Sequence, residues 1–307
     1  MEYGKYREIE YCVLDPTGNI TALVESEVDV ADQPAVASRI MELEPDVEQV
    51  GFITYADNGA AGAVFPEGSV PVSLRMAGGE FCGNATMCAA ALFAFRRGLP
   101  GAGPESLSVP VNVSGASKPL QVSLERQAAE LYSAAVSMPP ALAIEELNLA
   151  AGANTGTLSL PLVKMEGISH IIAEPDSGLF GLKDDPATAE ALLKDWCIAL
   201  KAECLGLMFL DEAGATWKTG SAVSSDTGAF NTERRRMIPL VYVPGADTMF
   251  WENSCASGSA AAGMYLAAKA GRPVDVTLDE PAGRLRVESD PGTGKTVLHG
   301  SVAFRLH

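Results

Sequence analysis

Histidine and positive charge are scarce in this sequence. Its three histidines stand apart at positions 170, 299 and 307, and its six cysteines form no Cys-x-x-Cys pair, which argues against structural zinc. Lysine and arginine number 22 against 39 aspartates and glutamates, so the 307-residue chain carries a net charge of −17. Such a chain is poorly suited to bind a nucleic-acid backbone or an anionic membrane.

Several other signals are absent. No apolar run approaches the roughly 18 residues of a membrane span, and the charged N-terminal residues do not resemble a signal peptide. The cysteines are scattered along a long chain, which is typical of reduced thiols, and we expect a cytoplasmic protein. No glycine fingerprint follows a strand-like segment and no lysine stands out as a pyridoxal anchor, so we expect no cofactor and no metal.

The chain contains enough apolar residues to form a hydrophobic core. Apolar residues make up 47% of it and charged residues 20%, and its length suits two domains. Periodicity predicts helices at 33–42, 83–97, 188–200 and 257–270, with short strands between them. Two β-rich halves, each with one strongly apolar helix, indicate an internal duplication. Residues 290–294 resemble part of a phosphate-binding loop but lack its first glycine, so we expect a hairpin turn there.

One motif occurs in both halves. The stretches EFCGNATMCAAALFAF, starting at Glu80, and WENSCASGSAAAGMYLAA, starting at Trp251, each place a cysteine between an acidic residue and an Ala-rich helix. These cysteines, Cys82 and Cys255, would lie at helix N-termini, where unpaired N–H groups and the helix dipole favour an anion. We therefore expect a depressed thiol pKa at both positions and a binding site for a carboxylate.

Two such thiols facing each other suit the inversion of an amino-acid centre. One removes a proton from one face of Cα while the other returns a proton to the opposite face. A single cysteine is more often a small core residue, but two in matched contexts favour a catalytic pair. The remaining cysteines lack that context and are expected to pack in the core or lie at the surface: Cys12, Cys88, Cys197 and Cys204.

At these residues the chain resembles the diaminopimelate-epimerase fold family of cofactor-independent amino-acid racemases. The likeness is greatest to its histidine-racemase branch, which makes D-histidine for staphylopine-type metallophores. The cysteine motifs carry it, together with DPTGNITALVES, EQVGFI, GLMFLDE and LVYVPGADTMFWENSC. It implies an α+β fold of two pseudo-symmetric domains, each a β-barrel around a central α-helix, in a homodimeric enzyme. The N-terminal domain would comprise residues 1–137 and a C-terminal strand at 298–307, and the second domain residues 138–297.

The resemblance also implies which residues form the site, between the two domains. Cys82 and Cys255 would be the catalytic thiols. Taken alone, an asparagine in a Gly-Asn turn, an acid before a helix and a histidine in a strand all have ordinary structural explanations. The substrate-binding residues would be Asn19, Glu48, Gly83, Asn84, His170, Glu252, Ala256 and Ser257.

The sequence departs from the family at positions that affect the substrate. Diaminopimelate epimerases carry an arginine upstream of the second cysteine, whereas residues 250–253 here contain none. Trp251 and Glu252 suit a flat, hydrogen-bonding side chain such as imidazole. Gly79 and Ala256 replace the usual asparagine and glycine. The resemblance thus implies a histidine racemase that inverts Cα with two thiols. The alternatives are a diaminopimelate-like or proline-like epimerase, a non-catalytic binding protein, and an isomerase that uses a carboxylate.

Overall fold

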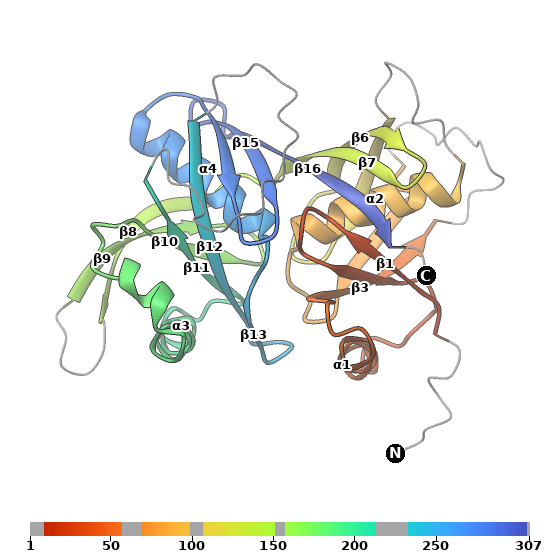
Figure 1. Ribbon diagram of the computed structural model, residues 1–307, viewed down its shortest axis with the longest axis horizontal. Helices are drawn as coiled ribbons and strands as arrows, with labels where there is room; N and C mark the ends of the chain where they lie inside the picture. Colours follow the sequence, from red (N-terminus) through yellow and green to blue (C-terminus); the bar gives the residue numbers. More distant parts are fainter. Residues whose placement is uncertain (1–8, 57–68, 99–106, 151–156, 213–232, 306–307) are drawn as a thin grey trace.

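The computed structural model describes residues 9–56, 69–98, 107–150, 157–212 and 233–305. The chain forms two lobes that lie side by side, each built from strands around one helix (Figure 1). Strands β1–β7 are Tyr11–Asp15, Thr21–Val24, Gln49–Tyr55, Val72–Met76, Leu107–Val113, Leu120–Ala128 and Leu131–Met138. Strands β8–β16 are Ala143–Ala150, Thr157–Lys164, Ser169–Ala173, Leu205–Leu210, Glu233–Val243, Thr248–Trp251, Val274–Asp279, Arg284–Asp290 and Lys295–Arg305.

The first lobe is a closed barrel around helix α2 (Gly83–Arg96). Strands β1–β7 follow in order, β16 pairs with β7, and a β1–β16 pairing closes the circle. All residues of α2 from Gly83 to Ala94 are buried. A helix that is apolar on every side belongs in a core, and its alanines keep it thin enough for strands to surround it. Helix α1 (Gln33–Leu43) packs outside the barrel and buries only one face.

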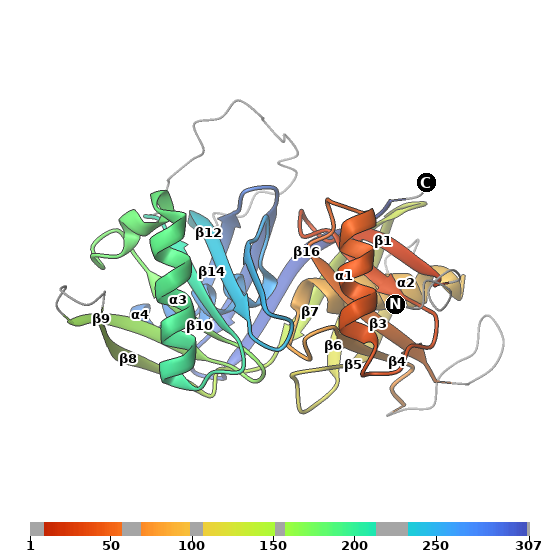
Figure 2. The same cartoon turned by 90° about the horizontal axis from the view of Figure 1, so that it is seen from below.

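The second lobe repeats this plan around helix α4 (Ala256–Ala270). Its strands run β8-β9-β10-β11-β12-β14-β15 and continue into β16. Residues Ala256 to Ala267 of α4 are buried, while α3 (Pro186–Leu200) covers the outside as α1 does in the first lobe (Figure 2). In the described part of the chain β8 pairs only with β9, so this set of strands has an edge. The predicted α+β class with one central helix per lobe is confirmed.

The four predicted helices are confirmed to within two residues at each end. Residues 290–294 form the expected hairpin turn, because β15 and β16 pair from Asp290 and Lys295 outward. Strand β8 is not apparent from the sequence, since AIEELNLA is rich in helix-forming residues. Its pairing with all of β9 overrides that local preference.

Strand β16 belongs to both lobes. Its first residues pair with β15, residues Thr296–Ala303 pair with β7, and its end pairs with β1. The C-terminal strand thus starts at Lys295, pairs with the first lobe and also extends the second sheet. The boundary at residue 138 stays a prediction. No helix in the described ranges is long and apolar enough to cross a membrane.

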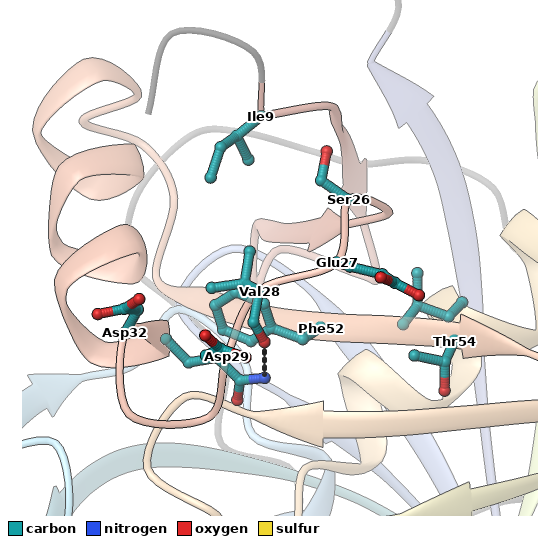
Figure 3. A pocket seen from close by; sticks show the side chains of 10 residues that line it. Ile9, Ser26, Glu27, Val28, Asp29, Asp32, Phe52 and Thr54 are labelled. Atoms are coloured by element: carbon teal, nitrogen blue, oxygen red, sulfur yellow. Dashed lines mark hydrogen bonds between the residues drawn. The ribbon is translucent and has the colours of Figure 1, made fainter. Parts of the chain in front are cut away.

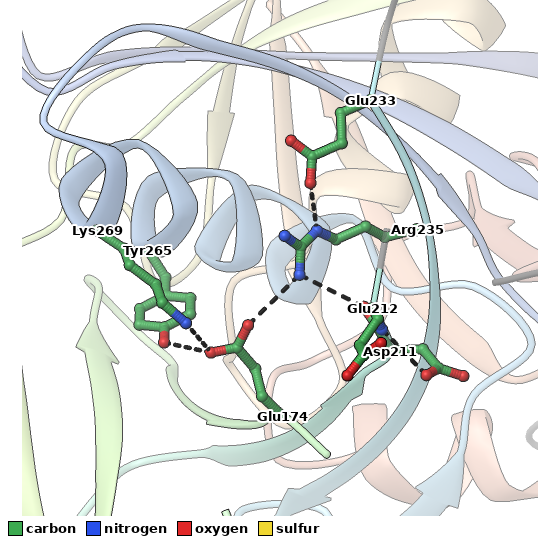
Figure 4. A network of polar contacts seen from close by, with 7 residues as sticks. All are labelled: Glu174, Asp211, Glu212, Glu233, Arg235, Tyr265 and Lys269. Atoms are coloured by element: carbon green, nitrogen blue, oxygen red, sulfur yellow. Dashed lines mark hydrogen bonds and ion pairs between the residues drawn. The ribbon is translucent and has the colours of Figure 1, made fainter. Parts of the chain in front are cut away.

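A polar network fixes the outer end of α4, away from its N-terminus (Figure 4). Glu174, just after β10, accepts hydrogen bonds from Tyr265 and Lys269 of α4 and pairs with Arg235 of β12. Burial and the hydrogen bond to Glu174 raise the pKa of Tyr265 to about 12, so its hydroxyl keeps its proton and acts as a donor. The network joins α4 to the two strands and limits movement of the helix along its axis.

The backbones of the two lobes touch at a pair of glycines, Gly115 and Gly167. Gly167 has φ +72°, and a Cβ built on it would lie 2.7 Å from Cα of Gly115 in the first lobe. Beside this contact Ser117 donates two hydrogen bonds to Glu166, from its backbone N–H at 2.7 Å and its hydroxyl at 2.8 Å. The two lobes thus approach each other at a point where no side chain fits.

Gly167→Ala tests this contact. Gly98→Ala is the matched control, because Gly98 also has a positive φ (+58°) but no atom within 4 Å of the position that a Cβ would take. Both variants carry the left-handed backbone penalty, and Gly167→Ala adds a clash that costs about 1–3 kcal/mol more. Urea unfolding measures both. Equal losses of stability in the two variants would contradict close packing at Gly167.

Candidate active site

The two motif cysteines cap the central helices. Cys82 is the N-cap of α2, and its Sγ accepts a hydrogen bond from the N–H of Ala85 at 3.4 Å. Cys255 is the N-cap of α4, and its Sγ accepts from the N–H of Gly258 at 3.3 Å. Both have extended backbones and free thiols. The sequence repeat therefore corresponds to a structural repeat at the start of each helix.

The N-termini of α2 and α4 lie against each other. A Cβ built on Gly83 would lie 2.9 Å from Cβ of Ala256, so a larger residue at position 83 would push the helices apart. Across the same contact, the side-chain amide of Asn84 donates to the carbonyl of Ser254 at 3.1 Å. The first N–H groups of two helices are thereby directed toward one small region, which favours an anion.

A small cavity lies where the helices meet. Its walls include both thiols, the first two residues of each helix, and the carboxylate residues Glu80 and Glu252. Its volume of about 20 Å³ is close to the minimum that holds one water molecule. The described state is therefore closed to any molecule much larger than water.

The larger hollows of the described structure lie elsewhere. The one between α1 and β3 has a volume of about 450 Å³ and is lined by Glu27, Asp29 and Asp32 among others (Figure 3). It contains no cysteine and none of the predicted site residues. Cavity volume alone therefore does not identify the cavity at the two thiols as the functional site. The chemistry of the residues that line each cavity does.

Seven of the ten predicted site residues line the cavity, and three do not: Asn19, Glu48 and His170. Asn19 is buried and donates to Glu48 at 3.1 Å. Glu48 in turn accepts from the backbone N–H of Asn253 at 3.2 Å and from its side-chain amide. This chain joins the first lobe to the segment that precedes Cys255, one layer behind the cavity.

His170 lies beneath the cavity in the second lobe. It is fully buried, and its Nε2 lies 3.0 Å from Oγ of Ser257, which is 3.6 Å from the Sγ of Cys255. Gly206 leaves room for the ring, because a side chain there would collide with Nδ1. Burial lowers the pKa of His170 to about 3, so the imidazole is neutral at physiological pH.

The expectation of depressed thiol pKa values is wrong. Burial raises the pKa of Cys82, and the negative charges of Glu252 and Glu80 raise it further. Burial, Glu252 and Glu280 likewise raise the pKa of Cys255 well above its usual range. The helix N–H groups act in the opposite direction, but the loss of hydration and the nearby carboxylates outweigh them. Both cysteines are thiols in this closed state.

Three polar residues at the site were not predicted. Gln49 donates to Glu252 at 2.9 Å from the other lobe, and Glu80 lines the cavity. Glu280, in the β14–β15 turn, is 3% exposed and accepts from the N–H of Cys255 at 2.5 Å and from the hydroxyl of Ser259. The signal for Glu80 was its place in the repeated motif, whereas Glu280 follows Asp279 and looks like part of a solvated turn.

Trp251 does not form the flat surface that was expected for an imidazole ring. Its ring stacks on Phe209 at a centroid distance of 5.8 Å, and its Nε1 donates to Glu190 of α3 at 2.8 Å. It does not line the cavity. Among the described residues, no group of three or more histidine, cysteine or carboxylate side chains is arranged to hold a metal ion.

Comparison with known proteins places this arrangement in a family. The family model of the histidine racemase CntK N-terminal domain matches residues 8–219 and 226–303. The chain belongs to the histidine racemase family. A histidine racemase from Fusobacterium nucleatum is 30% identical over 271 residues, covering 86% of this chain and 83% of that protein. One from Staphylococcus aureus is 26% identical over 283 residues, covering 92% and 88%.

The fold agrees with this assignment. A hydroxyproline epimerase from Agrobacterium vitis superposes with a TM-score of 0.58 at 12% identity, covering 97% of this chain and 89% of that one. The predicted family and enzyme class are confirmed, and this histidine racemase homologue is an isomerase of the amino-acid racemase class.

Glu280→Gln tests the burial of charge beneath Cys255. Burial raises the pKa of Glu280 from 4.5 to about 8. The folded state therefore holds a proton that the unfolded state releases, and stability falls as pH rises between these values. The variant should lose less stability over that range, by about 1.4 kcal/mol for each unit of raised pKa. Urea unfolding at several pH values measures this, with the exposed Glu125→Gln as control. An unchanged pH slope in Glu280→Gln would contradict it.

Proposed function

We propose that this protein racemises histidine without a cofactor, with Cys82 and Cys255 as the two proton carriers. The observation that carries the proposal is their matched position. Each thiol caps a buried central helix, and the two helix ends meet at one closed cavity. Inverting Cα requires one base and one acid on opposite faces, and a pair of thiols provides both.

The helix ends bind the α-carboxylate of the substrate in this mechanism. The backbone N–H groups at Gly83, Asn84, Ala256 and Ser257 lie at the first positions of α2 and α4, where no intrahelical acceptor exists. When one thiolate removes the α-proton, the electron pair of the C–H bond moves toward this carboxylate. The N–H groups stabilise the added charge, and the opposite thiol then donates its proton to Cα.

Formation of the thiolate needs an acceptor for its proton. Glu252 is hydrogen-bonded to the Cys255 thiol, and burial raises the pKa of Glu252 to about 8. A carboxylate with a pKa near neutrality can take the thiol proton and return it. Glu48 and Asn19 hold Asn253, two residues before Cys255, and so position this segment against the first lobe. His170 positions Ser257 from below.

Histidine is the substrate that the family favours. The relatives from Fusobacterium nucleatum and Staphylococcus aureus are histidine racemases. No arginine precedes Cys255 to bind a second carboxylate, and an unpaired carboxylate in a closed site is costly. The other parts of the proposal come from the resemblance: D-histidine for a staphylopine-type metallophore, made in the cytoplasm by a homodimer.

Replacement of either thiol tests the mechanism. Cys82→Ser and Cys255→Ser should each reduce racemisation by at least about 10²-fold, because each face of Cα loses its proton carrier. Cys197→Ser is the control, since Cys197 lies on α3 and its side chain packs in the separate core of the second lobe. Optical rotation and α-deuterium exchange from D₂O measure the rates. Near-normal turnover in either active-site variant would rule out the two-thiol mechanism.

A substrate panel tests the choice of amino acid. L-Histidine should exchange its α-proton faster than diaminopimelate or proline at equal concentration and neutral pH. Glu48→Gln should lower histidine turnover by about 10-fold, because a charged acceptor of the Asn19 and Asn253 hydrogen bonds is lost. Faster exchange with diaminopimelate or proline would overturn the substrate assignment and leave the thiol mechanism standing.

A further inference from the structure

Two buried acceptors at the cavity have no hydrogen-bond partner in the described structure. They are Oε2 of Glu80 and Oδ1 of Asn84, and both residues line the cavity. Glu80 is 9% exposed and Asn84 is 1% exposed. Buried polar atoms are almost always paired, so two unpaired acceptors beside one cavity indicate a ligand that brings donors.

The hydrogen bond to Ser254 shows which side-chain atom of Asn84 has no partner. Its side-chain nitrogen donates to the carbonyl oxygen of Ser254, and a carbonyl can only accept. The atom left over is therefore the amide oxygen, an acceptor. This places an amide acceptor on the same cavity as the Glu80 carboxylate.

The charge of Glu80 acts on the site itself. Its field raises the pKa of Cys82 and also that of Glu252, so the carboxylate lies close to both groups. Arg75 is a cation whose charge reaches Glu80, but its Nη1 donates to Gln33 and to the carbonyl of Met76. The Glu80 carboxylate also accepts hydrogen bonds from its own backbone N–H and from that of Gly78, but no cation of the described residues forms an ion pair with it and its Oε2 has no partner. A buried acid without an ion-pair partner is costly.

We infer that Glu80 and the side-chain oxygen of Asn84 bind the α-ammonium group of the substrate. An ammonium has three donors and a positive charge, whereas a neutral imidazole ring has one N–H. Glu252 differs from Glu80, because Gln49 already donates to it. The inference rests on the proposed racemase function and adds a substrate-binding residue to it. Bound there, the ammonium also offsets the negative field of Glu80 at Cys82 and favours the thiolate.

The test compares Glu80→Gln with the wild type toward two ligands that differ by one group. L-Histidine has the ammonium, and 3-(imidazol-4-yl)propionate is the same molecule without it. The variant should lower kcat/KM for histidine by about 10- to 100-fold, the loss expected for a charged hydrogen bond. The inhibition constant of the propionate should not rise. Glu125→Gln, an exposed change on β6, should alter neither value.

Other outcomes overturn the inference. An equal loss for histidine and the propionate means that Glu80 supports the site without binding the ammonium. Unchanged kcat/KM for histidine means that the ammonium binds elsewhere. Glu80→Asp keeps the charge and should retain more histidine activity than Glu80→Gln, and circular dichroism checks that both variants fold. If the wild type does not racemise histidine, the proposed function fails. The same pair of measurements then uses the amino acid that does exchange, with its deamino analogue.

Discussion

The meeting of two helix N-termini is the constraint on which the rest of this structure depends. Helices with like dipole ends repel each other, and Gly83 and Ala256 bring them into contact. The arrangement holds because each helix is enclosed by strands of its own lobe, and because polar links cross the contact. Asn84 bonds to Ser254, Gln49 to Glu252 and Glu48 to Asn253. The small residues allow the two helix ends to approach each other, and the polar links around them hold the ends in contact.

The site combines a region of positive potential with a region of negative potential. Its centre has the positive ends of two helix dipoles, its walls have the buried carboxylates Glu80 and Glu252, and Glu280 lies under Cys255. An amino acid has the complementary charges, with a carboxylate for the helix ends and an ammonium for an acid. In the closed protein the carboxylates and the loss of hydration raise the thiol pKa values. In the proposed mechanism a bound zwitterion changes that balance, so that thiolate formation depends on the presence of substrate.

The same architecture explains why the closed cavity is so small. The lobes are joined by the continuous strand β16, and they also touch through glycine pairs such as Gly115 with Gly167. Helices α2 and α4 also share one continuous apolar core that spans both lobes, whereas the core between α3 and the second sheet is separate. A cavity enclosed in this way excludes water, which favours the proposed proton transfer.

The sequence by itself determined the local and repeated features. Ala-rich apolar segments after Cys82 and Cys255 could only be buried helices, and two matched contexts identified the same position in each half. Residues such as Gly83 and Ser257 followed from their place in that motif. The two helices and the matched N-cap positions are confirmed, because they depend on neighbours within a few positions along the chain.

Tertiary structure alone decided burial and long-range partners. Gln49 reaches Glu252 across 203 positions, and Glu280 lies under Cys255 from a turn that looks solvated in the sequence. The sign of the thiol pKa shift depends on those buried acids, so the helix N-terminus alone gave the wrong direction. Trp251 points into the core of its own lobe for the same reason. Hydration and the charges that surround a group are set by the whole fold, and a local motif does not contain them.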